Sequence, residues 1–268
     1  MSDSAPERED QRMLEEYEIA RESAYCYEAL AAPGVRGSDK ALWYPFDSGS
    51  IPFFVLDCRT ERVQRRRRIT PHRAWMFKQK PDSTERLQID ALKEWLERHG
   101  SSDQPKFIVS SIPIAPVLRD HVGNPSLWRN ADNWFGYPAS LNWLAKLFAD
   151  LKPKNVVFLS GDYHFSATSQ LWFYDRQCRE GGAYQVVASG LYAPMPFANE
   201  RFEDYSWERC EAAPIAGHNS VVGFNASQLT KAQSHFVRVN AKQFDRSWHV
   251  DVAAIGANGA VLGSKRLF

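Results

Sequence analysis

Apolar residues recur along this chain with two different periods, and these periods predict where helices and strands lie. Between residues 13 and 30 they return at roughly helical intervals, which predicts one helix or a broken pair of helices. A second helical stripe covers residues 87–96, and a third covers residues 139–148.

Three short apolar runs, at residues 51–57, 106–111 and 156–159, are typical of strands that are covered on both faces. Together with the helical stripes they predict an α/β fold. The hydrophobic pattern of the chain changes after these runs. Four short segments, several of which alternate between apolar and polar residues, predict a largely antiparallel second sheet. They are residues 169–174, 184–189, 234–239 and 247–252.

The composition is that of a folded protein, since 44% of the 268 residues are hydrophobic and a chain of this length buries a substantial core. The formal net charge of +1 gives no electrostatic reason to expect nucleic acid or an anionic membrane as a partner. No apolar run approaches the length of a membrane span, and the residues after Met1 do not resemble a secretory signal. As it stands the chain is expected in the cytoplasm, and the localisation of a longer protein stays open.

Two features invite a functional interpretation but have a simpler one. The four cysteines are widely scattered and form no Cys-x-x-Cys motif, so we expect separate thiols in a reducing compartment. Residues 65–68 are consecutive arginines, which suggests a patch for phosphate or nucleic acid. A solvated loop is the favoured interpretation of this run, because neither interleaved aromatic residues nor a basic helix accompanies it.

The strongest candidate for chemistry follows the apolar run at residues 156–159. Gly161 lets the backbone leave the sheet sharply, and α/β proteins place ligands at the carboxyl ends of such strands. Asp162 and His164 lie two residues apart, so in an extended segment they offer a carboxylate and an imidazole to one point, as Mn, Fe or Zn requires. The alternative is that Asp162 caps the next segment and His164 packs as a structural histidine. A complete metal site needs more ligands than these two.

Other polar residues are weaker candidates. His121 and Asp132 lie in a long polar segment over residues 120–138, and they are either site residues or solvated loop residues. His218 follows a glycine in a loop and is the next candidate ligand. Three further histidines are expected to have structural roles at a helix end or on the faces of strands: His99, His235 and His249.

Residues 53–62, 105–113 and 155–164 form three motifs that resemble, in order and spacing, the second half of PhoD-like phosphatases of the calcineurin-like metallophosphoesterase superfamily. The resemblance covers roughly residues 40 to 200. Its most specific part is Ser-Gly-Asp-x-His at residues 160–164, and the next is Leu-Asp-x-Arg-Thr at residues 56–60.

This resemblance implies a two-sheet α/β sandwich with flanking helices and an enzyme that hydrolyses phosphoric esters, as a phosphatase or a phosphodiesterase. It implies that His164 is a metal ligand and that Asp162 is a ligand or orients one. One or two divalent or trivalent ions of Mn, Fe, Zn or Ca would activate a water for attack on phosphorus. It also implies that Arg59 binds the substrate phosphate, for which a salt bridge to Asp57 or Glu61 is the alternative role.

The chain departs from the family pattern near its beginning. The early metal-binding motifs of the family are absent from residues 1–50, and the strand that ends at Ser110 lacks a histidine that many metallophosphoesterases have. We therefore expect a helical or loop lead-in over residues 1–50 and a partial PhoD-like domain over residues 51–268 that lacks its amino-terminal strands and has an exposed sheet edge. An upstream segment or a partner chain would complete the metal site. The alternative is a truncated, non-catalytic domain or partner subunit.

Overall fold

The computed structural model describes residues 41–63, 69–79, 87–161, 163, 165–174, 180–188, 202–206, 211–230 and 234–268, together with Glu15, Glu18, Ile19 and Ser23. Most of the helix predicted between residues 13 and 30 lies outside these residues, as does the whole run of arginines at residues 65–68.

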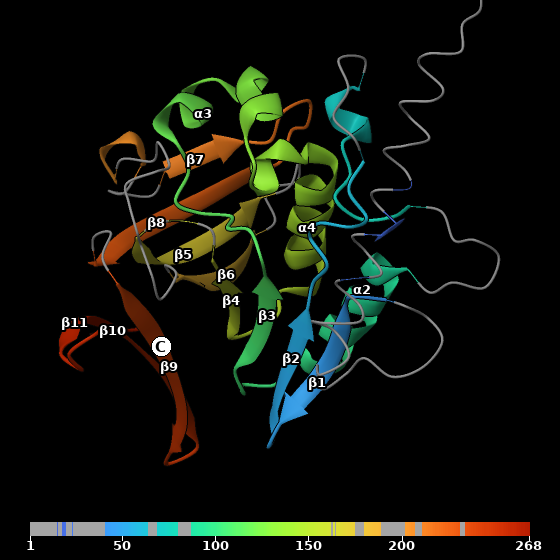
Figure 1. Ribbon diagram of the computed structural model, residues 1–268. Helices are drawn as coiled ribbons and strands as arrows, with labels where there is room; N and C mark the ends of the chain where they lie inside the picture. Colours follow the sequence, from blue (N-terminus) through green and yellow to red (C-terminus); the bar gives the residue numbers. More distant parts are fainter. Residues whose placement is uncertain are drawn as a thin grey trace, which may run out of the picture.

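Eight strands of the described residues form one large sheet in the order β1-β2-β3-β4-β6-β5-β8-β7 (Figure 1). Strands β2, β3, β4 and β6 run parallel, and the remaining strands pair antiparallel with their neighbours. The bounds are β1 (Tyr44–Ser48), β2 (Ile51–Val55), β3 (Lys106–Ser110), β4 (Val156–Ser160), β5 (Ser166–Tyr174), β6 (Glu180–Val187), β7 (Glu211–Pro214) and β8 (Val221–Thr230).

A second sheet contains three antiparallel strands, β9 (His235–Phe244), β10 (Ser247–Gly256) and β11 (Val261–Arg266). The prediction of a second antiparallel sheet is therefore confirmed for residues 234–239 and 247–252. It is wrong for residues 169–174, which belong to β5, and for residues 184–187 of the range 184–189, which belong to β6 of the large sheet. Alternating apolar residues indicate one buried face, but they do not specify the neighbouring strand, and here β6 pairs in parallel with β4.

Helices α2 (Gln88–His99) and α4 (Pro138–Leu151) pack on one face of the large sheet, and the second sheet covers part of the other face (Figure 1). Successive residues of β4 enter different cores: Phe158 packs on the helix side, whereas Val157 packs with Val250 and Val252 of β10. Both faces of the strand are thus buried, which explains its unbroken apolar sequence. The predicted α/β class with two sheets is confirmed.

The polar segment over residues 120–138 is packed more tightly than its sequence indicates. It contains three short helices, α3 (Arg119–Gly123), η3 (Pro125–Asn130) and η4 (Trp134–Gly136). The indole of Trp134 is fully buried, and His121 is only 8% exposed. The interpretation of His121 as a solvated loop residue is therefore wrong, because aromatic residues between the polar ones anchor the segment in the core. Two other described 3-10 helices are η2 (Pro71–Arg73) and η5 (Phe202–Asp204).

Strand β1 forms one edge of the large sheet among the described strands and makes an antiparallel hairpin with β2. This hairpin crosses the boundary predicted between residues 50 and 51, and the division of the chain into two parts stays a prediction. The absence of further amino-terminal strands next to β1 stays a prediction as well.

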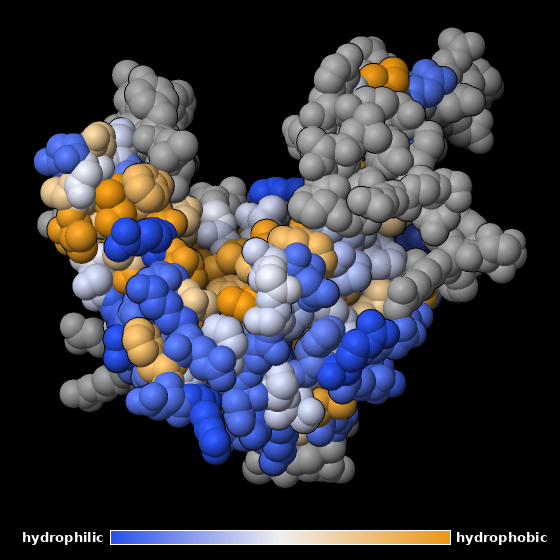
Figure 2. All heavy atoms as spheres, turned by 90° about the horizontal axis from the view of Figure 1, so that it is seen from below, coloured by the Kyte–Doolittle hydropathy of each residue, from blue (hydrophilic) through white to orange (hydrophobic). Residues whose placement is uncertain are grey.

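Seen from below, the lower part of the surface carries mostly hydrophilic side chains, and apolar side chains gather toward its left and centre (Figure 2). Large apolar side chains are also exposed on the second sheet, at Phe236, Phe244, Val261 and Leu262. Within the part of the chain that the structure describes, no helix is both long and apolar enough to cross a membrane.

Candidate functional site

The carboxyl ends of three parallel strands, β2, β3 and β4, meet at one edge of the large sheet. Val55 of β2 lies beside Val109 of β3, and Ser110 of β3 lies beside Ser160 of β4. We call this region the carboxyl edge. Because α/β proteins bind ligands in the crevice outside such strand ends, the carboxyl edge is the place to look for a site.

Buried polar side chains fix the backbone at the carboxyl edge. The hydroxyl of Ser110 donates to the carbonyl of Ile112 at 2.6 Å and accepts from Nε1 of Trp134 at 3.1 Å. The thiol of Cys58 lies 3.5 Å from the same hydroxyl, and burial raises its pKa. Since the thiolate is the form that binds metals and attacks electrophiles, Cys58 is suited to packing rather than to chemistry.

The turn after β2 is held by side chains on both of its sides. The carboxylate of Asp57 accepts hydrogen bonds from the backbone N–H groups of Arg59, at 2.9 Å, and of Thr60, at 2.8 Å. The buried amide of Gln88, on α2, accepts from Asp57 N at 2.8 Å and donates to Asp57 O at 3.2 Å. Gln88 also donates to the carboxylate of Glu61 at 3.2 Å. The backbone that carries Arg59 is therefore rigidly placed.

Two guanidinium groups of this turn share one carboxylate from a distant segment. Nη1 of Arg59 lies 3.1 Å from Oδ2 of Asp132, and Nη1 of Arg62 lies 2.9 Å from Oδ1 of the same residue. The guanidinium of Arg62 stacks over the ring of Tyr137, 4.8 Å from its centroid, and its Nε donates to the carbonyl of Cys58. The ion pair observed for Arg59 thus goes to Asp132, whereas the sequence suggested Asp57 or Glu61.

The charge of Asp132 responds to both arginines. Burial on its own would raise the pKa of this carboxyl, but the charges of Arg62 and Arg59 and their hydrogen bonds outweigh it, so the pKa of Asp132 lies below its usual value. The carboxylate is therefore ionised at neutral pH.

A second contact joins this cluster to the segment after β4. Asn133, the neighbour of Asp132, donates from Nδ2 to the hydroxyl of Tyr163 at 3.3 Å, and that hydroxyl donates to the carbonyl of Pro116 at 3.2 Å. In the sequence Tyr163 stands between Asp162 and His164, which lie outside the described residues. The buried Tyr163 thus links the arginine cluster to the segment that the sequence singles out.

The family model for PhoD-like phosphatases matches residues 3–237, which is most of the chain. The chain belongs to this family. One solved structure, described as "Structure of PhoD", is similar to 93% of this PhoD-like chain with 18% sequence identity and a TM-score of 0.49. The match covers 48% of that protein, so the PhoD-like chain spans about half of its length. No curated protein matches the chain. The family predicted from the three motifs is confirmed.

The described contacts of the other histidines of this PhoD-like chain are with residues other than Arg59 and Arg62. His121 lies in α3 beside a small hollow lined by Trp128 and Phe135, and burial lowers the pKa of its imidazole. His218 contacts His72 edge-on, with ring centroids 4.5 Å apart. His235 is buried, and its Nε2 lies 2.6 Å from the hydroxyl of Ser166. The two remaining histidines, for which the sequence predicted structural roles, contact aromatic rings: His99 contacts Trp95, and His249 contacts Phe244.

The described residues of the PhoD-like chain contain no group of three or more His, Cys, Asp or Glu side chains that could hold a metal ion. They bring to the carboxyl edge the two guanidinium groups of Arg59 and Arg62, paired with the carboxylate of Asp132. Sequence reasoning missed Arg62, together with the two residues Tyr137 and Gln88 that support the turn. The available signal was the spacing of two arginines, three residues apart in a turn that directly follows a buried strand.

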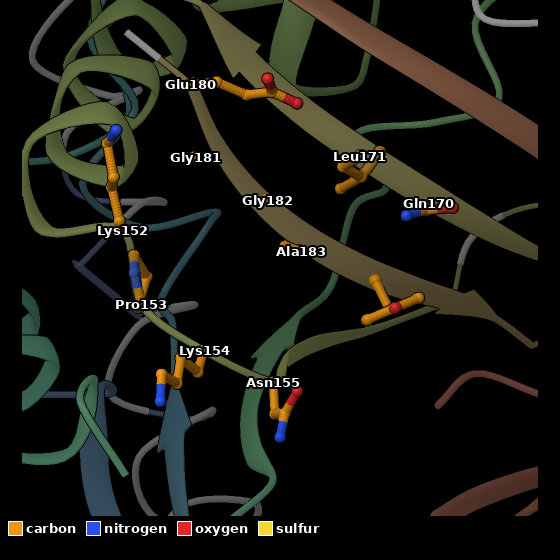
Figure 3. A pocket seen from close by; sticks show the side chains of 11 residues that line it. Lys152, Pro153, Lys154, Asn155, Gln170, Leu171, Glu180, Gly181, Gly182 and Ala183 are labelled. Carbon is orange, nitrogen blue, oxygen red and sulfur yellow. The ribbon is translucent and has the colours of Figure 1, made fainter. Parts of the chain in front are cut away.

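A separate pocket opens at the opposite end of β4, between the end of α4 and the start of β6 (Figure 3). Its polar side chains come from Lys152, Lys154, Asn155, Gln170, Glu180 and Tyr184. The ammonium of Lys154 is paired with Asp103 at 2.9 Å. No candidate residue from the sequence lines this pocket, so the carboxyl edge stays the candidate site.

Proposed function

We propose that this chain takes part in the metal-dependent hydrolysis of phosphoric esters, as a phosphatase or a phosphodiesterase, at the carboxyl edge of β2, β3 and β4. The observation that carries the proposal is the Arg59 guanidinium, which a rigid turn presents at this edge and which pairs with Asp132, the neighbour of the Asn133 that contacts Tyr163. Membership of the PhoD-like phosphatase family supports it.

Arg59 would bind the phosphate group, because a guanidinium presents two parallel N–H donors that match two phosphate oxygens. Asp162 and His164 would be metal ligands, for one or two ions of Mn, Fe, Zn or Ca. When bound, such an ion lowers the pKa of a water molecule and neutralises charge on the phosphate. The remaining ligands would come from an upstream segment or from a partner chain, since the early motifs of the family are absent from residues 1–50.

A second candidate is a non-catalytic PhoD-like domain or partner subunit. It is favoured by the absence of the early metal-binding motifs of the family from residues 1–50. The two candidates differ in metal content and in turnover, and both can be measured on the same preparation.

The test is elemental analysis of the purified protein together with hydrolysis of a chromogenic phosphate monoester and diester. We expect His164→Ala to lower metal content at least about tenfold in the complete enzyme, because a lost ligand typically weakens a metal site strongly. His249→Ala is the matched control, since His249 contacts Phe244 in the second sheet, and it should leave metal content unchanged. Equal metal content and turnover in the His164→Ala protein and the unmodified protein would refute the ligand role.

A further inference from the structure

The arrangement of Arg59, Arg62 and Asp132 suggests how the site treats an anion. Each arginine contacts a different oxygen of the same carboxylate, at 3.1 Å and 2.9 Å. Two oxygens of a phosphate group are spaced similarly to the two oxygens of a carboxylate, and guanidinium groups bind both in the same forked manner. The carboxylate of Asp132 therefore lies where a phosphate bound by both arginines would place two of its oxygens.

The two arginines differ in how firmly they are held. The side chain of Arg62 is 13% exposed and is fixed by Tyr137 and by the carbonyl of Cys58. Its Nη2 is buried and has no hydrogen-bond partner among the described residues, so it still has donor capacity for another oxygen. The side chain of Arg59 is 46% exposed, on a turn whose backbone is fixed by Asp57. The guanidinium of Arg62 is thus held in place before an anion binds, whereas the guanidinium of Arg59 can adjust its position.

The carboxylate of Asp132, which lies between the two guanidinium groups, is held less firmly than Arg62. The side chain of Asp132 is 57% exposed, and its pair with the 46% exposed Arg59 is of the kind that contributes little to stability. Asp132 lies between η3 and η4, outside the strands. A phosphate dianion carries more charge than a carboxylate, so it gains more from two guanidinium groups once the carboxylate has moved away.

We propose that Arg59 and Arg62 form a single two-arginine fork for a phosphate group, and that Asp132 is an internal anion that competes for it. The inference rests on the proposed function, because it specifies how the same site recognises phosphate. Arg62 becomes a second phosphate-binding residue, and Asp132 lowers the affinity of the site for phosphate. A phosphate group therefore binds by exchanging with the Asp132 carboxylate.

The test is a titration of the purified 268-residue chain with inorganic phosphate in the presence of a chelator, so that binding does not depend on a metal. Calorimetry gives the affinity, and the ¹⁵N resonances of the arginine side chains show which guanidinium groups respond. Asp132→Asn removes the competing charge and nearly preserves the shape of the side chain. We expect it to tighten phosphate binding about fivefold or more. Resonances of both Arg59 and Arg62 should shift.

Two further variants make the result specific. Arg62→Lys or Arg59→Lys, each combined with Asp132→Asn, should remove most of the gain in affinity, and the exposed Arg59 tolerates replacement even if Arg62 does not. Asp251→Asn is the matched control, because Asp251 forms a similarly exposed pair with Arg266 at 2.8 Å on the second sheet. It should bind phosphate as the unmodified chain does.

The inference is overturned if Asp132→Asn binds phosphate no more tightly than the unmodified chain, if Asp251→Asn gives the same gain, or if neither arginine resonance responds. Ester hydrolysis by the complete enzyme is a separate readout. Hydrolysis with unchanged phosphate affinity in Asp132→Asn would reject the fork and keep the proposed function. If the phosphate affinities of the variants are as predicted but the complete enzyme hydrolyses no ester, the proposed function is rejected and the fork is kept.

Discussion

Replacing Gln88 tests whether the turn that carries Arg59 is fixed from α2. In Gln88→Met the side chain keeps a similar length but loses its amide, so the N–H and the carbonyl of Asp57 lose their partners at 2.8 Å and 3.2 Å. Asp57 is only 7% exposed, so water replaces these bonds poorly. A buried backbone group left without a partner costs about 1–3 kcal/mol. Better burial of the thioether offsets part of this cost.

The expected result is a loss of about 2–4 kcal/mol in the free energy of unfolding, measured by urea denaturation. Gln170→Met is the control, because Gln170 is exposed on β5, and its effect should stay within about 0.5 kcal/mol. Phosphate affinity should fall in Gln88→Met, since Arg59 is then held less firmly. A change in unfolding free energy below about 1 kcal/mol would show that the Gln88 amide does not fix the turn.

A second replacement at the same position separates hydrogen bonding from charge. Gln88→Glu keeps an acceptor for Asp57 N but brings a carboxylate next to Asp57 O and to the carboxylate of Glu61. The pKa of the introduced glutamic acid should therefore lie above its unfolded value. A carboxyl whose pKa is raised in the folded state contributes to the free energy of unfolding at low pH, and this contribution is lost as pH rises through the folded pKa. The variant should thus be less destabilised, relative to the unmodified protein, at pH 5 than at pH 8.

Two further predictions concern the scaffold. The ammonium of Lys106 is buried and donates to three backbone carbonyls, the nearest that of Ser102 at 2.6 Å, and burial lowers its pKa to about 8. Between pH 8 and 10.5 the unfolded chain then binds more protons than the folded chain. The free energy of unfolding should therefore rise over this range by about 1–2 kcal/mol relative to that of Lys106→Met. Parallel pH profiles of the two proteins would exclude this. Gly181→Ala should lower the free energy of unfolding by about 2 kcal/mol or more, since its Cβ would lie 2.1 Å from the carbonyl of Phe148. Gly182→Ala is the control in thermal denaturation, because the nearest atom to its Cβ would be 3.7 Å away. Equal midpoints for the two variants would contradict the close approach at Gly181.

The sequence predicted those elements whose burial is visible residue by residue. Strand β4 is an apolar run because Phe158 and Val157 enter two different cores, and α4 has a helical stripe because one of its faces packs on the sheet. The family was also recognisable from sequence, since its motifs are contiguous stretches at strand ends. Arg59 entered the candidate site in the same way, through its motif.

The tertiary structure decided what depends on contacts between distant residues. The segments of β5 and β6 alternate as expected, but backbone pairing with β4 places β6, and with it β5, in the large sheet. Asp132 lies 73 residues from Arg59 and 70 from Arg62, and no local pattern indicates that its carboxylate joins both guanidinium groups. The periodicity of apolar residues indicates which side chains are buried and which are exposed. Strand order and shared ion pairs depend instead on how separate segments pack together.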